Sequence, residues 1–311
     1  MRSRSTAVLA AVLALAFPAV LLQASPGAQA AAPVVLYDQT ANAATPSADP
    51  GAPNFSPSND FGGDTDRTAD DFVVPAGATW AISEIGVAGA FEAPTTESTV
   101  NVYLYADAAG KPGNQIFSQL AVVATGAPNF VVPLTGAPAL TAGTYWVTVQ
   151  FIVDGGPFWS WGTSTVQRGN PAHWTGLEGP AECQAGWAVR TVCWAGTHPD
   201  QVFVLKGTDL TPSNDVELGK PVRNKKTGTA TLPVTVPGGG SLALAGRNVA
   251  PRQLVAAGAG KLKLKVKATG PAKAKLKETG KVTVKVKVTF TPTGGVAKTV
   301  TKKVKLRKDL D

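Results

Sequence analysis

Charged and aliphatic residues alternate one by one along parts of the last third of the chain. Residues 261–267 read Lys-Leu-Lys-Leu-Lys-Val-Lys, and residues 281–290 place Val or Phe at every second position. Successive side chains of a strand point to opposite sides of a sheet, so both segments predict strands with lysine on one face and aliphatic residues on the other. A sheet with one apolar face needs a second sheet to cover that face.

Three further segments of this region show a similar two-residue pattern. Residues 229–236 and 241–245 alternate small or polar residues with aliphatic ones, and residues 296–306 follow a Gly-Gly turn as a hairpin partner of 281–290. The count of about six or seven strands is enough for an immunoglobulin-like sandwich. Phe290 is its single aromatic residue, so aliphatic packing has to form the core.

Strand signals also recur at short intervals from Val34 to Gly207, between clusters of Gly, Pro, Asn and Asp. The clearest strands are predicted at residues 99–105, 143–153 and 202–205. Residues 107–114 contain the Gly and Pro residues of a chain reversal. Such spacing favours a sandwich or a jelly roll. The predicted fold class is therefore all-β, with a jelly-roll-like β-sandwich followed by an immunoglobulin-like one.

The first 30 residues have the features of an export signal. Two arginines supply a basic start, residues 7–22 are almost all apolar, and Ala28-Gln29-Ala30 is a small-residue cleavage site. A retained transmembrane anchor is the alternative, but the apolar run is short of the roughly 20 residues that a spanning helix needs, and Pro18 interrupts it. No later segment predicts a membrane span. We expect a secreted, extracellular or cell-surface protein without a transmembrane span in the mature chain.

Composition divides the rest of the chain into two parts. Residues 31–208 contain all seven tryptophans and few Lys or Arg, whereas residues 216–311 are dense in lysine and contain few acids. Between them, residues 209–215 have the composition of a linker. We therefore predict a signal peptide at 1–30, an acidic Trp-rich β-sandwich domain at 31–208, the linker, and a Lys-rich β-sandwich domain at 216–311. The net charge of +8 averages two modules of opposite character.

Cys183 and Cys193 are the two cysteines of the chain. An even number of cysteines in an exported chain predicts one disulfide, which would close a short loop around Trp187. A metal-binding pair is the weaker interpretation, because two thiolates without nearby histidines do not complete a zinc site.

An acidic segment between residues 60 and 71 could bind calcium. Asp60, Asp64, Asp66 and Asp70 offer the oxygen ligands that this cation prefers, on a loop that contains Gly. The spacing does not match an EF-hand, and the favoured interpretation is a solvated acidic loop whose Asp residues form side-chain turns. We expect no cofactor, and a structural calcium ion is the alternative.

Aromatic residues gather in the second half of the first domain. Trp faces stack on sugar rings, so Trp159, Trp161, Trp174 and Trp187 could form a carbohydrate-binding platform. Trp159 and Trp161 lie on one face of a strand, which suits either a platform or a core. Core packing is the favoured interpretation, because tryptophan is usually mostly buried.

The sequence shows no catalytic motif. The two histidines, His173 and His198, belong to no metalloprotease motif, and no nucleophile elbow is present. We therefore expect a protein without enzymatic activity. Two carboxylates could still hydrolyse a glycosidic bond, so a glycoside hydrolase is the third interpretation, after a structural or adhesion protein and a carbohydrate-binding module.

Several segments of the first domain resemble exported bacterial β-sandwich ectodomains of the choice-of-anchor type. The resemblance covers nearly all of residues 34–208 and implies a surface or secreted module with no established activity. The segments that carry it are residues 69–80, 102–107, 110–113, 140–146 and 200–207.

Residues 216–307 resemble a lysine-rich sandwich module at the C-termini of exported actinobacterial proteins. The matching stretches are 224–232, 237–246 and the two lysine strands. The resemblance implies a spacer or attachment module outside the cell and brings no active-site residues.

The lysine faces allow two interpretations. Lysine on strands keeps a sandwich soluble and discourages edge pairing, and it also attracts polyanions such as cell-wall or extracellular polysaccharides. Nucleic acid is a poor candidate, because the module lacks the aromatic residues on which bases stack. We expect a monomeric structural or adhesion protein that attaches electrostatically to the envelope through its basic module.

Overall fold

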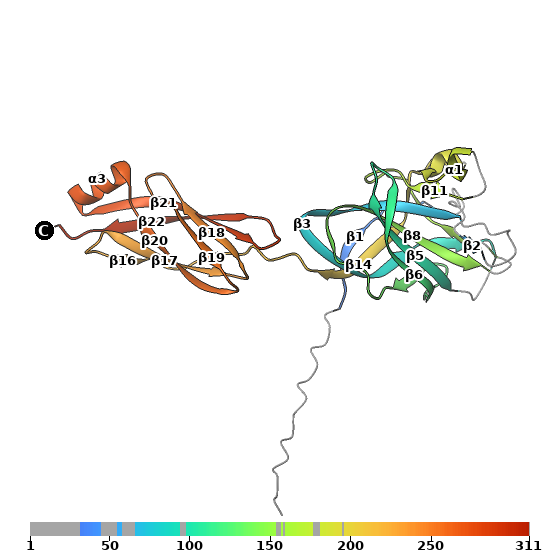
Figure 1. The fold of residues 1–311 in the computed structure, drawn as a ribbon, viewed down its shortest axis with the longest axis horizontal. Coiled ribbons are helices and arrows are strands. Elements are labelled where there is room, and N and C mark those ends of the chain that lie inside the picture. The colour runs from blue at the N-terminus through green and yellow to red at the C-terminus, as the bar shows by residue number, and fades with distance from the viewer. Residues whose placement is uncertain are drawn as a thin grey trace, which may run out of the picture. The chain divides into compact units, whose positions relative to one another are not determined.

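The chain consists mainly of strands in several antiparallel sheets, with three short helices among the residues that the structure describes (Figure 1). The structure is a computed structural model. It describes residues 32–44, 55–57, 66–93, 98–153, 157, 159–176, 181–194 and 196–310. The predicted signal peptide lies outside these residues. The all-β prediction is confirmed at this level.

A large sheet forms the centre of the first half, in the order β1-β14-β3-β8-β5-β6. These neighbours all pair antiparallel. Their bounds are Val34–Asp38 for β1, Phe203–Asp209 for β14, Arg67–Val87 for β3, Leu140–Val153 for β8, Thr99–Asp107 for β5 and Pro112–Val123 for β6. The three strands predicted in this half are confirmed as parts of β5, β8 and β14. The predicted reversal is the short connection from β5 to β6.

Shorter strands complete this half. The parallel strand β2 and the antiparallel strands β7 and β11 join the large sheet, β12 pairs with β11, and β4–β9 and β10–β13 form two small ribbons. Their bounds are Phe55–Pro57 for β2, Val131–Pro133 for β7, His173–Thr175 for β11, Ala188–Val189 for β12, Gly89–Phe91 for β4, Trp159–Trp161 for β9, Thr163–Ser164 for β10 and Asp200–Gln201 for β13.

One main hydrophobic core lies in this half, beside two smaller clusters. It takes residues from the large sheet, such as Leu104, Val147 and Phe151, and from the β4–β9 ribbon, whose Trp159 and Trp161 are fully buried. Several large aromatic rings pack among its aliphatic residues: Phe130 stacks on Phe151 with 5.7 Å between ring centroids. Each such ring removes a large apolar area from water and so adds to the stability of this half.

Two four-stranded sheets form the last third. The first has the order β15-β17-β16 with β20 on β17, and the second has the order β19-β18-β21-β22. Their bounds are Glu217–Leu218 for β15, Val222–Asn224 for β16, Thr229–Val236 for β17, Gly240–Ala245 for β18, Arg252–Ala256 for β19, Gly260–Lys267 for β20, Lys281–Pro292 for β21 and Lys298–Arg307 for β22. The five strands predicted here are confirmed; the sequence pattern did not reveal β15, β16 and β19.

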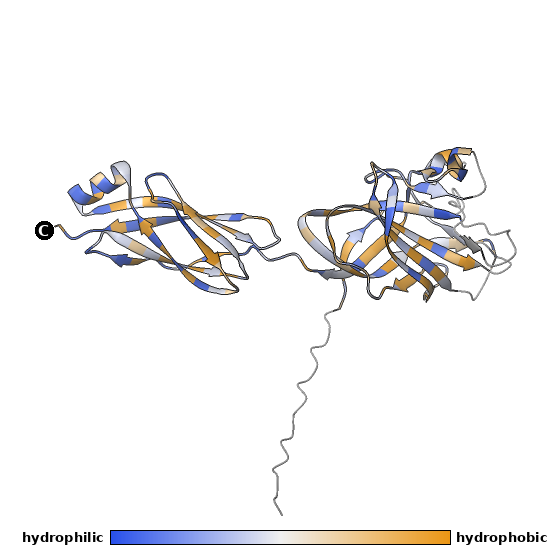
Figure 2. Ribbon diagram, in the orientation of Figure 1, coloured by the Kyte–Doolittle hydropathy of each residue, from blue (hydrophilic) through white to orange (hydrophobic). Residues whose placement is uncertain are grey.

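Both sheets contribute to a single second core. Leu232, Leu264 and Val266 come from the first sheet, and Val286 and Phe290 come from the second, each at most 1% exposed. The lysines between the core residues of β20 and β21 are exposed. Figure 2 shows hydrophilic and hydrophobic residues in turn along these strands. The predicted division into a lysine face and an aliphatic face is therefore confirmed.

The helix α3 (Gly270–Thr279) was not predicted, because the two-residue period of its neighbours suggested strands throughout. Its local signals are present: a proline follows the first residue, helix-forming Ala, Lys and Leu fill the interior, and Gly280 caps the end at φ 64°. Ala272 and Leu276 are buried in the second core, while its three lysines face solvent. The helix therefore covers one part of the core and adds to the basic surface.

We predict that Gly280→Ala lowers the free energy of unfolding by about 1 kcal/mol or more, because φ 64° disfavours a side chain. The added Cβ would also lie 2.9 Å from the Lys308 carbonyl oxygen. Chemical denaturation measures the change. Gly238→Ala is the control, because its Cβ meets nothing within 4 Å. Equal effects of both substitutions would contradict this account of the helix end.

Candidate functional site

The outer face of the paired strands β21 and β22 carries more cationic side chains than that of any other strand pair that the structure describes. Lys285 lies directly opposite Lys303, and Lys281 lies directly opposite Arg307. All four side chains are exposed. Like charges directly opposite each other on a sheet are destabilising, so these two pairs weaken the sheet that carries them.

Few acidic groups offset this charge. Among the described residues from 210 onward, the acids are Asp215, Glu217, Glu278 and Asp309, and the one ion pair joins Lys298 of β22 to Asp215. That pair is exposed and lies outside the two like-charge pairs; pairs of this kind contribute about 0–1 kcal/mol. The positive charge of the face is therefore available to a partner.

The outer face of β20 has a different arrangement. Its four lysines, at positions 261, 263, 265 and 267, are exposed and lie opposite Thr235, Pro233, Thr231 and Thr229 of β17. Alternate residues of a strand are about 6.6 Å apart. The result is a row of single charges beside an uncharged row, without the opposed cations of the other sheet.

Lys302 of β22 departs from the alternation. Its register partner is Val286, a core residue, so Lys302 belongs to the inward-facing set of its strand. The side chain is only partly exposed, and its Nζ donates a hydrogen bond to the Leu218 carbonyl oxygen at 2.8 Å. A long aliphatic stem lets lysine cover apolar surface while its ammonium group finds a polar partner. Lys302 is therefore a structural cation that fastens β22 to β15.

The chemistry available to the basic faces is electrostatic attraction. Flexible ammonium groups carry three donors each and no catalytic geometry of their own. Stripes of one charge raise the local concentration of oppositely charged ligands, and salt weakens the attraction beyond about 8 Å at physiological ionic strength. Such a face suits repeated anionic groups rather than one small molecule.

A second set of polar residues is buried in the first half, around Asp70 of β3. Asp70 is 0% exposed. Its Oδ2 accepts hydrogen bonds from Gln39 Nε2 at 2.8 Å and from the Gln201 backbone N–H at 2.7 Å, and its Oδ1 accepts one from the Asp71 N–H. The carboxyl group thus joins β3 to β13 and to the segment after β1, as expected for a buried polar group.

Two more carboxyl groups belong to this buried cluster. Asp71 Oδ2 accepts hydrogen bonds from the backbone and side chain of Asn170, at 3.0 and 2.7 Å, and Asp200 accepts one from the Arg168 N–H. Burial raises the pKa of Asp200 to about 7, and burial with repulsion from Asp200 raises the pKa of Asp70 well above its usual range. Sequence reasoning missed Asp71 and Asp200 as partners of Asp70.

The predicted calcium ligands fall partly on this cluster. Asp60 and Asp64 lie outside the described residues, while Asp66 and Asp70 are both 0% exposed. Both oxygens of Asp70 accept hydrogen bonds from protein donors. Within the described part of the chain, no three His, Cys, Asp or Glu side chains are grouped so that they could hold a metal ion. The described residues therefore give no support to calcium binding.

The four tryptophans of the predicted platform do not share one surface. Trp159, Trp161 and Trp174 are 0% exposed, and Trp187 is half-buried. Trp159 Nε1 donates to the Pro128 carbonyl oxygen at 2.9 Å, and Trp161 Nε1 donates to that of Val202 at 2.8 Å. These rings cannot stack on a sugar as they lie here, which agrees with the favoured core-packing interpretation.

Trp187 packs in a separate, partly exposed aromatic cluster. Its ring meets Tyr105 edge to face at 5.5 Å, and Tyr105 stacks on Tyr103 at 6.3 Å. The guanidinium of Arg67 lies 4.7 Å from the Tyr103 ring centroid, within the range of a cation–π interaction. Sequence reasoning did not connect these residues, because they come from β3, from β5 and from the segment between α1 and β12.

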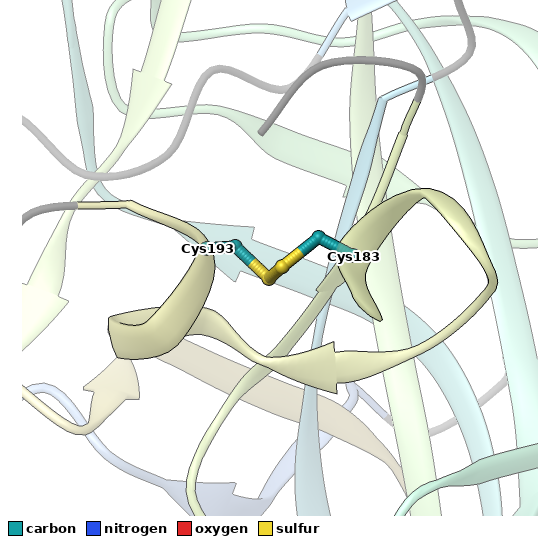
Figure 3. Close-up of a disulfide and its surroundings, with 2 residues drawn as sticks. All are labelled: Cys183 and Cys193. Carbon is teal, nitrogen blue, oxygen red and sulfur yellow. A yellow bond between two sulfur atoms is a disulfide. The ribbon is translucent and has the colours of Figure 1, made fainter. Parts of the chain in front are cut away.

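The predicted disulfide between Cys183 and Cys193 is confirmed (Figure 3). It joins the short helices α1 (Ala181–Gln184) and α2 (Arg190–Cys193). Both cysteines are buried beside Trp174, which meets Trp194 edge to face at 5.5 Å. The bond thereby closes a small loop over its own aromatic cluster.

The two histidines lie in structural surroundings. His173 packs edge to face on the buried Trp146 at 5.0 Å, and burial lowers its pKa. His198 Nδ1 lies 3.0 Å from Thr163 Oγ1, but Thr163 is 1% exposed. A hydroxyl group that is closed to solvent cannot meet a substrate in this conformation.

Comparison with known proteins found no family model and no curated protein that matches this chain. The resemblances to choice-of-anchor ectodomains and to actinobacterial lysine-rich modules therefore stay predictions. None of the helices in the described part of the chain is long and apolar enough to cross a membrane.

We predict that the melting temperature of the protein falls as pH rises from about 5 to 7. The pKa of Asp200 is about 7 in the folded chain, against 3.8 for an aspartate in water, so over this range the folded state holds a proton that the unfolded state has lost. The proton on Asp200 thus stabilises the folded state at low pH, and this contribution is lost as pH rises towards 7. Asp200→Asn should flatten the profile in calorimetry, whereas the exposed Asp309→Asn should not. A wild-type slope in the Asp200 variant would contradict the assignment.

Proposed function

We propose that this chain is an exported, non-enzymatic structural or adhesion protein that attaches to envelope or extracellular polyanions through its basic faces. The observation that carries the proposal is the set of opposed cations on β21 and β22, which have no acidic partners in their ladder. A fold gains nothing from such pairs, because they weaken it. A polyanionic ligand gives them a role.

Protection against aggregation explains some of the lysines on these strands but not the opposed cations of β21 and β22. Lysine on an edge strand discourages pairing with other chains, which suits β20 and β22. The strand β21, however, pairs with β22 along residues 281–290 and with β18 along residues 287–292. Lys287 lies where β21 is paired on both sides, so edge protection does not explain it. For Lys281 and Lys285, which β18 does not pair, edge protection explains a charge but not the cation directly opposite, because a soluble surface is served as well by charges of both signs.

The proposed domain organisation follows the two cores. We propose a signal peptide at 1–30, a jelly-roll-like sandwich at 31–208, a linker at 209–215 and an immunoglobulin-like sandwich at 216–311. The two cores share no residue, and their boundary falls between β14, which ends at Asp209, and β15, which begins at Glu217. The disulfide is compatible with an oxidising, extracellular location.

The alternatives have less support. A glycoside hydrolase needs two carboxyl groups that reach the substrate, whereas Asp70, Asp71 and Asp200 are at most 1% exposed. A carbohydrate-binding platform needs exposed rings, and three of its four tryptophans are fully buried. Trp187 could contact a ligand only as a member of its cluster with Tyr103 and Tyr105.

We predict that the mature full-length protein binds an immobilised acidic polysaccharide and is released as NaCl rises to about 0.5 M, because salt screens exposed charges. A neutral polysaccharide of similar length on the same support is the control and should retain little protein. Retention measured across a salt gradient gives the result. Binding that ignores salt, or equal binding to the neutral polymer, would argue against electrostatic attachment.

A further inference from the structure

The cations of β21 and β22 follow a regular spacing on the outer face. Successive outward positions pair Lys281 with Arg307, Thr283 with Lys305, Lys285 with Lys303 and Lys287 with Thr301. Outward positions on a strand repeat about every 6.6–6.8 Å, so four neighbouring steps each carry at least one cation. The charged band ends at Thr289 and Thr299, whose hydroxyl groups hydrogen-bond to each other at 2.7 Å.

Two of these steps carry a cation on both strands. The Cβ atoms of directly opposed residues are about 4.5–5.5 Å apart, which lets two long side chains reach one ligand group between them. One anion that contacts both cations would relieve their repulsion. This differs from β20, where each lysine is opposed by threonine or proline and no pair of cations converges.

We propose that the Lys281–Arg307 and Lys285–Lys303 pairs bind phosphate groups of an extended, phosphate-bearing polymer. The inference rests on the proposed polyanion-binding function and specifies its site and ligand class. A phosphate group within a polymer exposes at least two free oxygens, and each group along the chain carries a negative charge, so one phosphate can accept hydrogen bonds from two cations while its neighbours face the next pair. The planar guanidinium of Arg307 also matches phosphate oxygens in a bidentate geometry.

The matched variants replace two lysines on each sheet. Lys285→Thr with Lys303→Thr removes one opposed pair and creates the Thr–Thr arrangement that this ladder already contains at Thr289 and Thr299. The control, Lys263→Thr with Lys265→Thr, removes the same charge from β20, where the opposing residues are the uncharged Pro233 and Thr231. Both variants are made in the mature full-length chain.

Binding is measured by fluorescence anisotropy with labelled long-chain inorganic polyphosphate. We expect the Lys285/Lys303 variant to lose about ten- to thirtyfold in affinity and the control to lose less than about threefold. The slope of log affinity against log salt should fall by about 1 to 2 in the first variant, as expected for two lost phosphate contacts. Polygalacturonate of equal charge should bind the wild type more weakly.

Stability gives an independent readout. Removing an opposed pair of cations should raise the melting temperature by about 1–4 °C, and polyphosphate should raise that of the wild type more than that of the variant. In the β20 control, the substitution should change the melting temperature less, and polyphosphate should still raise it nearly as much as in the wild type. A variant that gains stability and loses binding identifies a ligand site, because replacing residues that only maintain the fold would lower stability.

The outcomes separate this inference from the proposed function. Equal losses of affinity in the two variants, or equal binding of polygalacturonate, would overturn the phosphate site while leaving polyanion binding in place. Stronger binding to phosphatidylglycerol vesicles than to polyphosphate would also overturn it, in favour of a lipid surface. A wild type that binds none of these probes would overturn both the site and the proposed function.

Discussion

Burial of aliphatic side chains between two sheets is the constraint on which the basic surface depends. Leu264 and Val266 on one sheet and Val286 and Val288 on the other are at most 1% exposed. Each contributes roughly 1.5–3 kcal/mol when it leaves water. Because strand residues alternate between faces, burying this set obliges the intervening lysines to point outward. Burial of the aliphatic residues thus determines on which face the lysines lie.

The two halves of the chain use polar groups in opposite ways. In the first half, Asp70 and Asp200 are buried, and hydrogen bonds from Gln39, Gln201 and Arg168 join separate strands through them. Such groups specify how the strands fit together, and their burial makes stability depend on pH. In the last third, polar groups are displayed to solvent instead. This contrast is the reason for proposing that the basic sheets bind the ligand.

The strands were predictable because their two-residue period is local, and each strand of the last third that carries it was found. Features that depend on distant contacts were not. The helix α3 interrupts a strand-like region, Lys302 reaches the Leu218 carbonyl oxygen on another sheet, and Asp200 approaches Asp70 only after folding. The tryptophans show the same limit: alternation placed Trp159 and Trp161 on one face, but only the packing of β9 under the large sheet decides that this face is the core.

Lysine footprinting tests the central claim most directly. The full mature chain is treated briefly with an amine-reactive reagent, and tandem mass spectrometry resolves the modification of each lysine. The account predicts fast modification of Lys285, Lys303 and Lys305, which face outward, and modification of Lys302 that is slower by at least about threefold, since its Nζ donates to Leu218. Equal rates along β22, or slow modification of the outward lysines, would contradict it.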